Sequence, residues 1–99
     1  MLIVATVSYP TQYSAEFGKR VMQMPPPPSF ITIKGPFATS ELGTGIKGMS
    51  LFEFDQDKTG EAMKYVADRY AKYIGVPGLT YNIVVWFEAM EALKMIGLA

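Results

Sequence analysis

The stretch at residues 2–9, LIVATVSY, is apolar on both faces of the strand that it predicts. Successive side chains of a strand point to opposite faces, so Leu2 and Val4 lie on one face and Ile3 and Val7 on the other. A strand of this kind is typical of the middle of a sheet that is covered on both sides. Whatever this chain folds into must therefore cover both faces of the sheet.

Three further segments have the composition of strands, at residues 29–35, 47–55 and 79–87. The last of them is again apolar on both faces. Pro36 follows the first of the three and fits an edge strand, because an edge can dispense with one amide donor. The polar, glycine-bearing residues 38–45 predict a connection between strands.

Amphipathic stretches predict helices at residues 11–24, 58–75 and 88–97. In the longest, Met63, Val66, Tyr70 and Ile74 recur at spacings of three and four and form one apolar stripe. Four consecutive prolines, residues 25–28, end the first helix because proline has no amide hydrogen.

Two polar side chains are placed to cap these helices, and one charged pair is placed to stabilise the longest helix. Thr11 stands at the start of the first helix and Asp57 precedes the second, and both residue types are favoured N-caps. Asp68 and Lys72 are four positions apart in the order that favours an ion pair.

The order β-α-β-β-α-β-α predicts an α+β fold with a single domain over residues 1–99. A split βαβ unit repeated twice gives the ferredoxin-like βαββαβ arrangement, here with a C-terminal helix. Its sheet is four-stranded and antiparallel, with two helices on one face. Right-handed crossovers place the first and third strands in the middle.

Both helices then cover the same face, which leaves the other face without a cover. Hydrophobic residues make up 49% of the chain and charged residues 18%, so a domain of this size must hide apolar surface beyond its own core. A second copy packed through the sheet face is the simplest cover, and the sequence predicts a homodimer.

Composition also limits the function classes. Nine basic and nine acidic residues cancel, which argues against binding nucleic acid or an anionic membrane surface. The chain has no cysteine and no histidine, so thiolate and imidazole chemistry is excluded and we expect no metal and no cofactor. The apolar opening is too short to span a membrane and lacks the basic region of a signal peptide. A cytoplasmic location is the expectation.

With its strand order, its proline-rich break and the motif K-G-x-x-x-F-E-F, the chain resembles the dimeric α+β barrel group of ferredoxin-like proteins. Within the group it is most similar to short, uncharacterised prokaryotic proteins. The motif consists of Lys47, Gly48, Phe52, Glu53 and Phe54. The resemblance implies a function among those of the group, which include cofactor-free monooxygenases, haem-degrading enzymes, muconolactone-type isomerases and ligand-sensing domains. Several of these use a histidine, which this chain lacks.

Glu53 is the most unusual residue, because it lies between Phe52 and Phe54 in a predicted central strand. A carboxylate in that position must be paired, hydrogen-bonded or close to water. Lys34 on the neighbouring strand is a candidate partner. The pair is either a structural ion pair or part of a ligand site in which a desolvated carboxylate acts as a base.

Tyrosines are the other candidates for a site. Tyr9, Tyr70 and Tyr81 lie on strands or on the longest helix, where a buried hydroxyl either knits a core or lines a cavity. The run GTGIKG at residues 43–48 matches the phosphate-binding pattern G-x-G-x-x-G. It leads into a strand and not a helix, so it predicts a hairpin connection.

Three functions remain open on the sequence. The first is a homodimer that binds a small, partly apolar molecule between sheet and helices, through Glu53, Lys34 and the three tyrosines. The second is a cofactor-independent isomerase or monooxygenase that uses Glu53 or a tyrosine as proton carrier, so whether the protein is an enzyme is uncertain. The third is a structural or assembly module.

Overall fold

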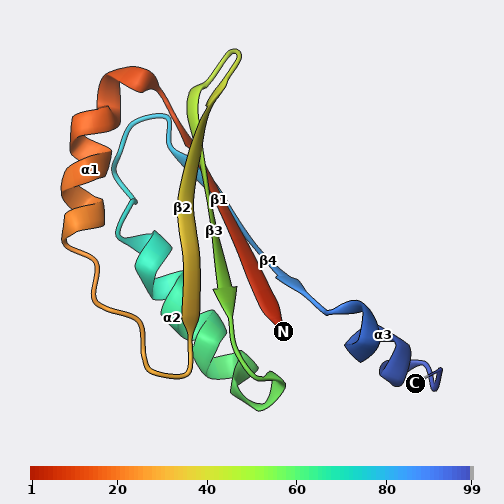
Figure 1. The fold of residues 1–99 in the computed structure, drawn as a ribbon. Coiled ribbons are helices and arrows are strands. Elements are labelled where there is room, and N and C mark those ends of the chain that lie inside the picture. The colour runs from red at the N-terminus through yellow and green to blue at the C-terminus, as the bar shows by residue number, and fades with distance from the viewer. Residues whose placement is uncertain (99) are drawn as a thin grey trace.

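The structure is a computed structural model that describes residues 1–98. One antiparallel sheet has the strand order β2-β3-β1-β4, which confirms that the first and third strands lie in the middle. The strands are β1 (Leu2–Tyr9), β2 (Thr32–Glu41), β3 (Gly45–Glu53) and β4 (Thr80–Trp86). The helices are α1 (Ser14–Met22), α2 (Thr59–Ala71) and α3 (Ala89–Met95). The predicted ferredoxin-like α+β arrangement with a C-terminal helix is confirmed (Figure 1).

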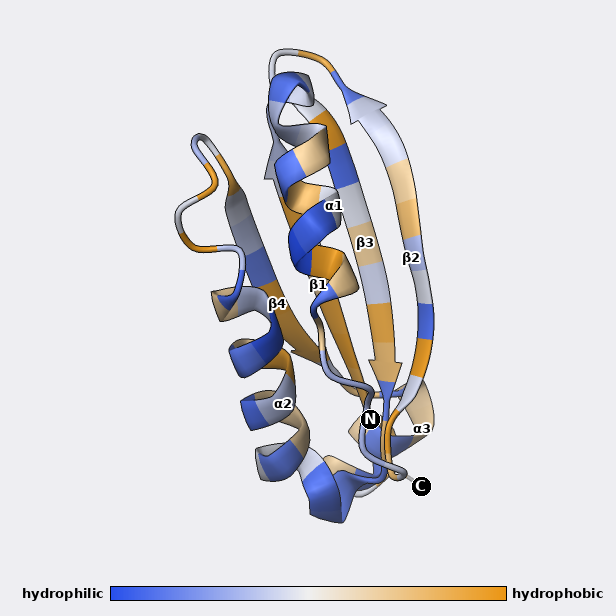
Figure 2. Ribbon diagram, turned by 90° about the vertical axis from the view of Figure 1, so that its left-hand side faces the viewer, coloured by the Kyte–Doolittle hydropathy of each residue, from blue (hydrophilic) through white to orange (hydrophobic). Residues whose placement is uncertain are grey.

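The core lies between the sheet and the two helices α1 and α2, which cover the same face (Figure 2). Ile3 of β1 pairs with Phe52 of β3 and with Val85 of β4, so their side chains share this covered face. Ile3, Phe52 and Val66 of α2 are completely buried. Alternation along β1 decides the packing, because Ile3, Ala5, Val7 and Tyr9 are buried while the residues between them are half-buried.

β2 runs further than the sequence predicts. The strand continues through Pro36 to Glu41, so the expectation of a connection over residues 38–45 is wrong. A register shift between Lys34 and Phe37 takes up the proline, and pairing with β3 resumes at Phe37. Because β2 is an edge strand, such a bulge costs little of the ladder. Of the glycine-rich run at residues 43–48, only Gly43 and Thr44 lie in the hairpin turn, and the rest belongs to β3, which begins at Gly45.

Both covering helices start later than predicted. Thr11 and Asp57 lie inside short 3-10 turns, Thr11–Tyr13 and Gln56–Lys58, that precede α1 and α2. The predicted caps are therefore wrong, and Tyr13 and Lys58 take the N-cap positions. Each 3-10 turn leads directly into its α-helix, so the α-helix begins after the residue that the cap preference selects. A rule based on residue type alone does not detect such a turn.

The end of α2 differs in a similar way. The helix ends at Ala71, and Ile74 lies in the following turn with 69% of its surface exposed, so it does not belong to the buried stripe. The predicted ion pair between Asp68 and Lys72 is replaced by one between Lys64 and Asp68, at 2.9 Å. Lys72 is the C-cap of the helix, and Asp68 pairs instead with Lys64, one turn earlier.

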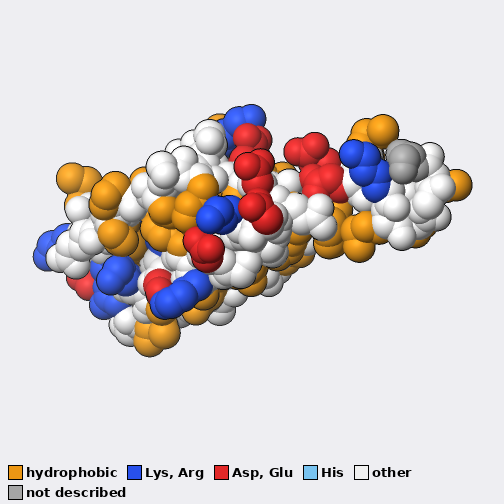
Figure 3. All heavy atoms as spheres, turned by 90° about the horizontal axis from the view of Figure 1, so that it is seen from below, with side chains coloured by type: hydrophobic (Ala, Val, Ile, Leu, Met, Phe, Trp, Pro, Cys, Tyr) orange, Lys and Arg blue, Asp and Glu red, His pale blue; other side chains and the backbone are white. Residues whose placement is uncertain are grey.

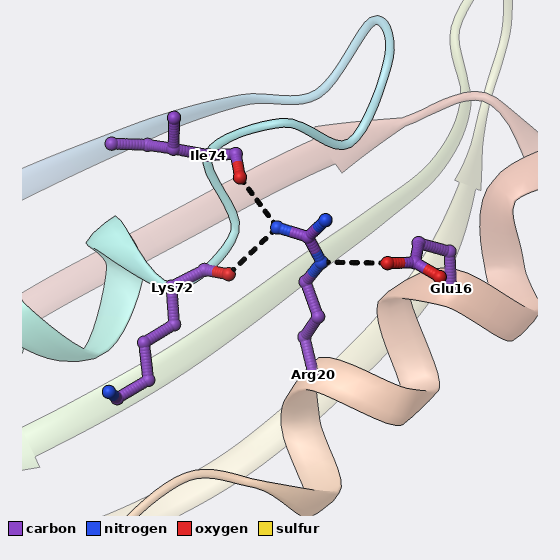
Figure 4. A network of polar contacts seen from close by, with 4 residues as sticks. All are labelled: Glu16, Arg20, Lys72 and Ile74. Atoms are coloured by element: carbon purple, nitrogen blue, oxygen red, sulfur yellow. Dashed lines mark hydrogen bonds and ion pairs between the residues drawn. The ribbon is translucent and has the colours of Figure 1, made fainter.

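Arg20 fastens α1 to the segment after α2 (Figure 4). Its Nε donates a hydrogen bond to Glu16 Oε1 at 3.0 Å, and its Nη1 donates to the carbonyl oxygens of Lys72 and Ile74. Carbonyls after a helix end have no partner within the helix, so the guanidinium satisfies groups that would otherwise need water. This bridge fixes the two covering helices relative to each other.

α3 lies apart from the other two helices. Figures 1 and 2 together place it beyond the end of β4, on the side of the sheet opposite to α1 and α2. The ammonium group of Met1 contacts Glu91 Oε1 at 2.9 Å and ties the helix to the start of β1. In the part of the chain that the structure describes, no helix has the length and apolar character needed to cross a membrane.

Candidate functional site

The face of the sheet that α1 and α2 leave uncovered, termed the open face here, is apolar at its centre. Val4 pairs with Leu51 on one side and with Val84 on the other, and cross-strand partners share a face. Phe37 and Trp86 extend this surface to the two edge strands, and their side chains are 53% and 56% exposed. Large apolar side chains therefore cross the whole width of the sheet in contact with solvent.

Polar pairs border the open face at both ends of the strands. At one end Lys34 Nζ lies 2.9 Å from Glu53 Oε1, so the predicted partner of Glu53 is confirmed. At the other end Ser8 Oγ donates to Glu41 Oε2 at 2.9 Å, and Lys47 Nζ lies 3.9 Å from Glu41 Oε1. This distribution, apolar in the centre and polar at the margin, is that of a protein–protein interface.

A hollow of about 740 Å³, termed the terminal hollow, opens at the Glu53 end of the sheet. Segments far apart in the sequence form it: the starts of β1 and β2, the end of β3, and α3. Phe30, Phe54 and Met95 supply apolar lining. The charged groups that line it are Glu53, Asp55, Glu88, Glu91 and Lys94. Figure 3, seen from this end, shows acidic groups gathered here beside the terminal helix.

Tyr9 and Tyr81 lie on the covered face of the sheet and Tyr70 on α2, which packs against that face, whereas Glu53 and Lys34 lie on the open face. Tyr9 and Tyr70 are buried, and Tyr81 is 40% exposed with its ring centroid 5.7 Å from that of Tyr70. The structure therefore does not bring the five predicted residues together into one site. Since Tyr9 belongs to the same alternating set as Ile3 and Val7, the separation follows from the face on which each residue falls.

The tyrosines belong to an aromatic cluster that the sequence did not fully reveal. Phe17 of α1 stacks between Tyr9 and Tyr73, with ring centroids 4.2 and 4.7 Å apart. Burial raises the pKa of Tyr9 and of Tyr70, and burial raises the pKa of Tyr73 to about 12. These hydroxyls thus stay protonated at neutral pH, and the cluster holds α1 and α2 on the sheet.

We expect this cluster to make the fold sensitive to alkali. The pKa of Tyr73 is 10.0 in an ordinary environment and about 12 in the folded chain, so its contribution to stability is complete below pH 10 and is lost as the pH rises to 12. The loss for this residue is roughly 2–3 kcal/mol. Urea unfolding from pH 8 to 12 measures it. Tyr73→Phe should show a flatter dependence, and an equally steep profile in that variant would contradict this assignment.

Glu53 and Lys34 are 45% and 57% exposed, so their ion pair is screened by solvent. We expect Glu53→Gln to change the free energy of unfolding by no more than about 1 kcal/mol, the usual range for an exposed pair. Thermal melts of the wild type and the variant from pH 5 to 8 measure the change. Lys34→Met is the matched control for the other partner. A loss of several kcal/mol in either variant would show that the pair is far drier than this geometry indicates.

The structure offers no cluster of metal ligands within residues 1–98, since no three histidine, cysteine, aspartate or glutamate side chains are grouped to hold an ion there. The expectation of a protein without metal or cofactor stays a prediction. A second hollow, of about 480 Å³, lies beside Arg20 and is lined by Lys19 and Lys72 among others. Arg20 is occupied by the contacts that join the helices, so we assign no ligand to this hollow.

Comparison of the chain with protein families, with curated proteins and with solved structures finds no match. The resemblance to the dimeric α+β barrel group stays an expectation from the sequence.

Proposed function

We propose that this protein is a cytoplasmic homodimer that packs through the open faces of its two sheets and binds a small, partly apolar molecule at the terminal hollow. The observation that carries the proposal is the apolar centre of the open face. Val84, Met49, Phe37 and Trp86 leave between 38% and 56% of their surfaces in contact with water in the single chain. The cytoplasmic location stays a prediction that no observation tests.

Burial of such a face is favourable at about 25 cal/mol for each Å² of apolar surface removed from water. Two sheets pack about 10 Å apart when their inner faces interdigitate, and the side chains of Val4 and Leu51 lie at the centre of this face. The polar pairs at Glu53 and Glu41 stand at the margin, where solvent continues to reach them. A second copy therefore covers the apolar centre without burying unpaired charge.

The terminal hollow is the better place for a small ligand. The space between the sheet and the helices, where the sequence predicted the ligand, is occupied by the completely buried side chains of Ile3, Phe52 and Val66. The terminal hollow has a volume within the range of small-molecule sites, about 300–1,000 Å³. Phe30 and Met95 would contact an apolar group, and Glu53 a polar one.

The catalytic alternative draws no specific support from these residues, and we do not propose it. Glu53 is half-exposed and paired with Lys34, and the buried tyrosines hold their protons more tightly than usual. The alternative of a purely structural module differs from our proposal only at the hollow. Ligand titration therefore separates the two.

Dimerisation can be followed through Trp86, the only tryptophan of the chain. Its side chain lies on the open face and is 56% exposed in the single chain, so it should be covered in the dimer. We expect its emission to shift to longer wavelength on dilution from 100 μM to 10 nM. Emission that stays constant and is typical of exposed indole at every concentration would count against the dimer.

Ligand binding can be probed with benzylamine, benzyl alcohol and benzoate, which share a ring and differ in charge. NMR titration should give saturable shifts confined to residues around Phe30, Phe54 and Met95 with at least one of them. Met95→Lys should abolish the shifts, whereas Met22→Lys, at an exposed position on α1, should not. Small shifts spread over the surface that never saturate would favour the structural module.

A further inference from the structure

α3 has apolar side chains that its own chain leaves exposed. Glu91, Lys94 and Met95 line the terminal hollow and so face the body of the molecule. Met90, Leu93 and Ile96 recur at helical spacing on the opposite side. Met90 in α3 and Ile96 directly after it are 59% and 68% exposed, and Leu93 between them is half-buried. We call these three residues the arm stripe.

The position of α3 places the arm stripe near the open face of the sheet. The helix lies on the side of the sheet opposite to α1 and α2, which is the side on which the proposed second copy packs (Figures 1 and 2). Trp86 on the open face is followed by Phe87, 44% exposed, and Glu88, which precedes the helix, lines the terminal hollow. Figure 3 shows hydrophobic atoms along this connection, on the side away from the acidic groups. The apolar surface of the sheet thus continues into the helix.

The size of the sheet indicates that its open face alone is a small interface. Four strands spaced about 4.8 Å apart, with the eight residues of β1 rising about 3.3 Å each, cover roughly 500 Å² per copy. A stable interface buries about 800 Å² of accessible surface per partner, and the accessible surface of a face covered by side chains exceeds its flat area. Apolar surface beside the sheet adds to the area that a dimer can bury. α3 is the element that stands next to the proposed interface with apolar side chains uncovered.

We infer that α3 is an exchanged arm: in the homodimer proposed above, on which this inference rests, the arm stripe of each copy packs against the other copy. The occupant of the stripe is a second copy of this chain, because the stripe continues an apolar face that already requires one. The contact between the Met1 ammonium and Glu91 holds the polar side of the helix on its own chain and leaves the stripe turned outward. Each copy thereby covers the arm stripe of the other, which its own chain leaves exposed.

The test compares dissociation constants from sedimentation equilibrium for three chains. The double variant Met90→Ser/Ile96→Ser removes the arm stripe. Met22→Ser is the control, since Met22 is 86% exposed on α1 and lies outside both the open face and the terminal hollow. We expect the double variant to weaken the dimer about 100-fold or more, because both copies lose both side chains, and Met22→Ser to change it less than about threefold.

A second measurement does not use the double variant. The chain has no cysteine, so one introduced thiol is the only one to react. We expect Ile96→Cys to be slow to react with a maleimide at dimer concentrations and fast on dilution. Ala67→Cys, at an exposed position on α2, should react fast at both.

The outcomes separate this inference from the proposed function. A wild-type dimer whose affinity does not change in the double variant would overturn the arm and leave the sheet interface standing. A wild-type chain that is monomeric throughout would overturn both. If the wild type binds phosphatidylcholine vesicles through the stripe and the double variant dimerises normally, the occupant is a lipid surface and the arm inference is wrong.

Discussion

Val4→Asp is expected to leave the protein monomeric at concentrations at which the wild type is a dimer. Val4 lies between Leu51 and Val84 at the centre of the open face, where a carboxylate would be taken out of water without a partner. Burial of an unpaired charge costs several kcal/mol, so the dissociation constant should rise by at least about 1,000-fold. Sedimentation velocity over a concentration series measures the change.

Two controls show whether this effect belongs to the interface. Thr44→Asp adds the same charge at an exposed position in the turn before β3 and should leave the dimer intact. Val4→Thr keeps the shape of the side chain and should weaken the dimer far less than aspartate does. A Val4→Asp protein that keeps the wild-type dissociation constant would show that the open face is not the contact surface.

Phe52→Ala is expected to have the largest effect on the fold itself. Phe52 is completely buried near the end of β3, and its ring meets those of Tyr65 and Tyr70 edge-on, at centroid distances of 6.5 and 6.4 Å. Truncation of a buried phenylalanine costs about 3–5 kcal/mol, out of a total of about 5–15 kcal/mol for a domain of this size. Urea unfolding at a fixed protein concentration should show the loss.

The matched control for this core variant is Met22→Ala. Met22 ends α1 with 86% of its surface exposed, so its truncation should change stability by less than about 0.5 kcal/mol. If Phe52→Ala were no more harmful than Met22→Ala, the packing of α2 against β3 described above would be wrong.

The sheet could be predicted from the sequence because strand side chains alternate with a period of two. That alternation assigns Val4 to the open face, and it places Glu53 beside Lys34 once the strands are adjacent. The tyrosines could have been assigned by the same rule. Tyr9 falls with Ile3 on the covered face, so a site that joins it to Glu53 was never compatible with the alternation.

Other features could not be predicted from local patterns. The continuation of β2 past Pro36 depends on a bulge that the pairing with β3 stabilises. The terminal hollow is formed by four segments that meet only in the folded chain. The sequence of α3 predicts a helix with one apolar side, and the structure has a helix there. No local rule states whether that side faces its own chain or another molecule.

The molar mass of the wild-type protein in solution is the most direct test of the central claim that the open face is covered by a second copy. We predict that light scattering at micromolar concentration gives twice the 11.0 kDa mass of one chain, and that the mass falls to that of one chain in Val4→Asp. A mass of 11.0 kDa for the wild type across the micromolar range would contradict the account, because the open face with Phe37, Met49 and Trp86 would then remain in water.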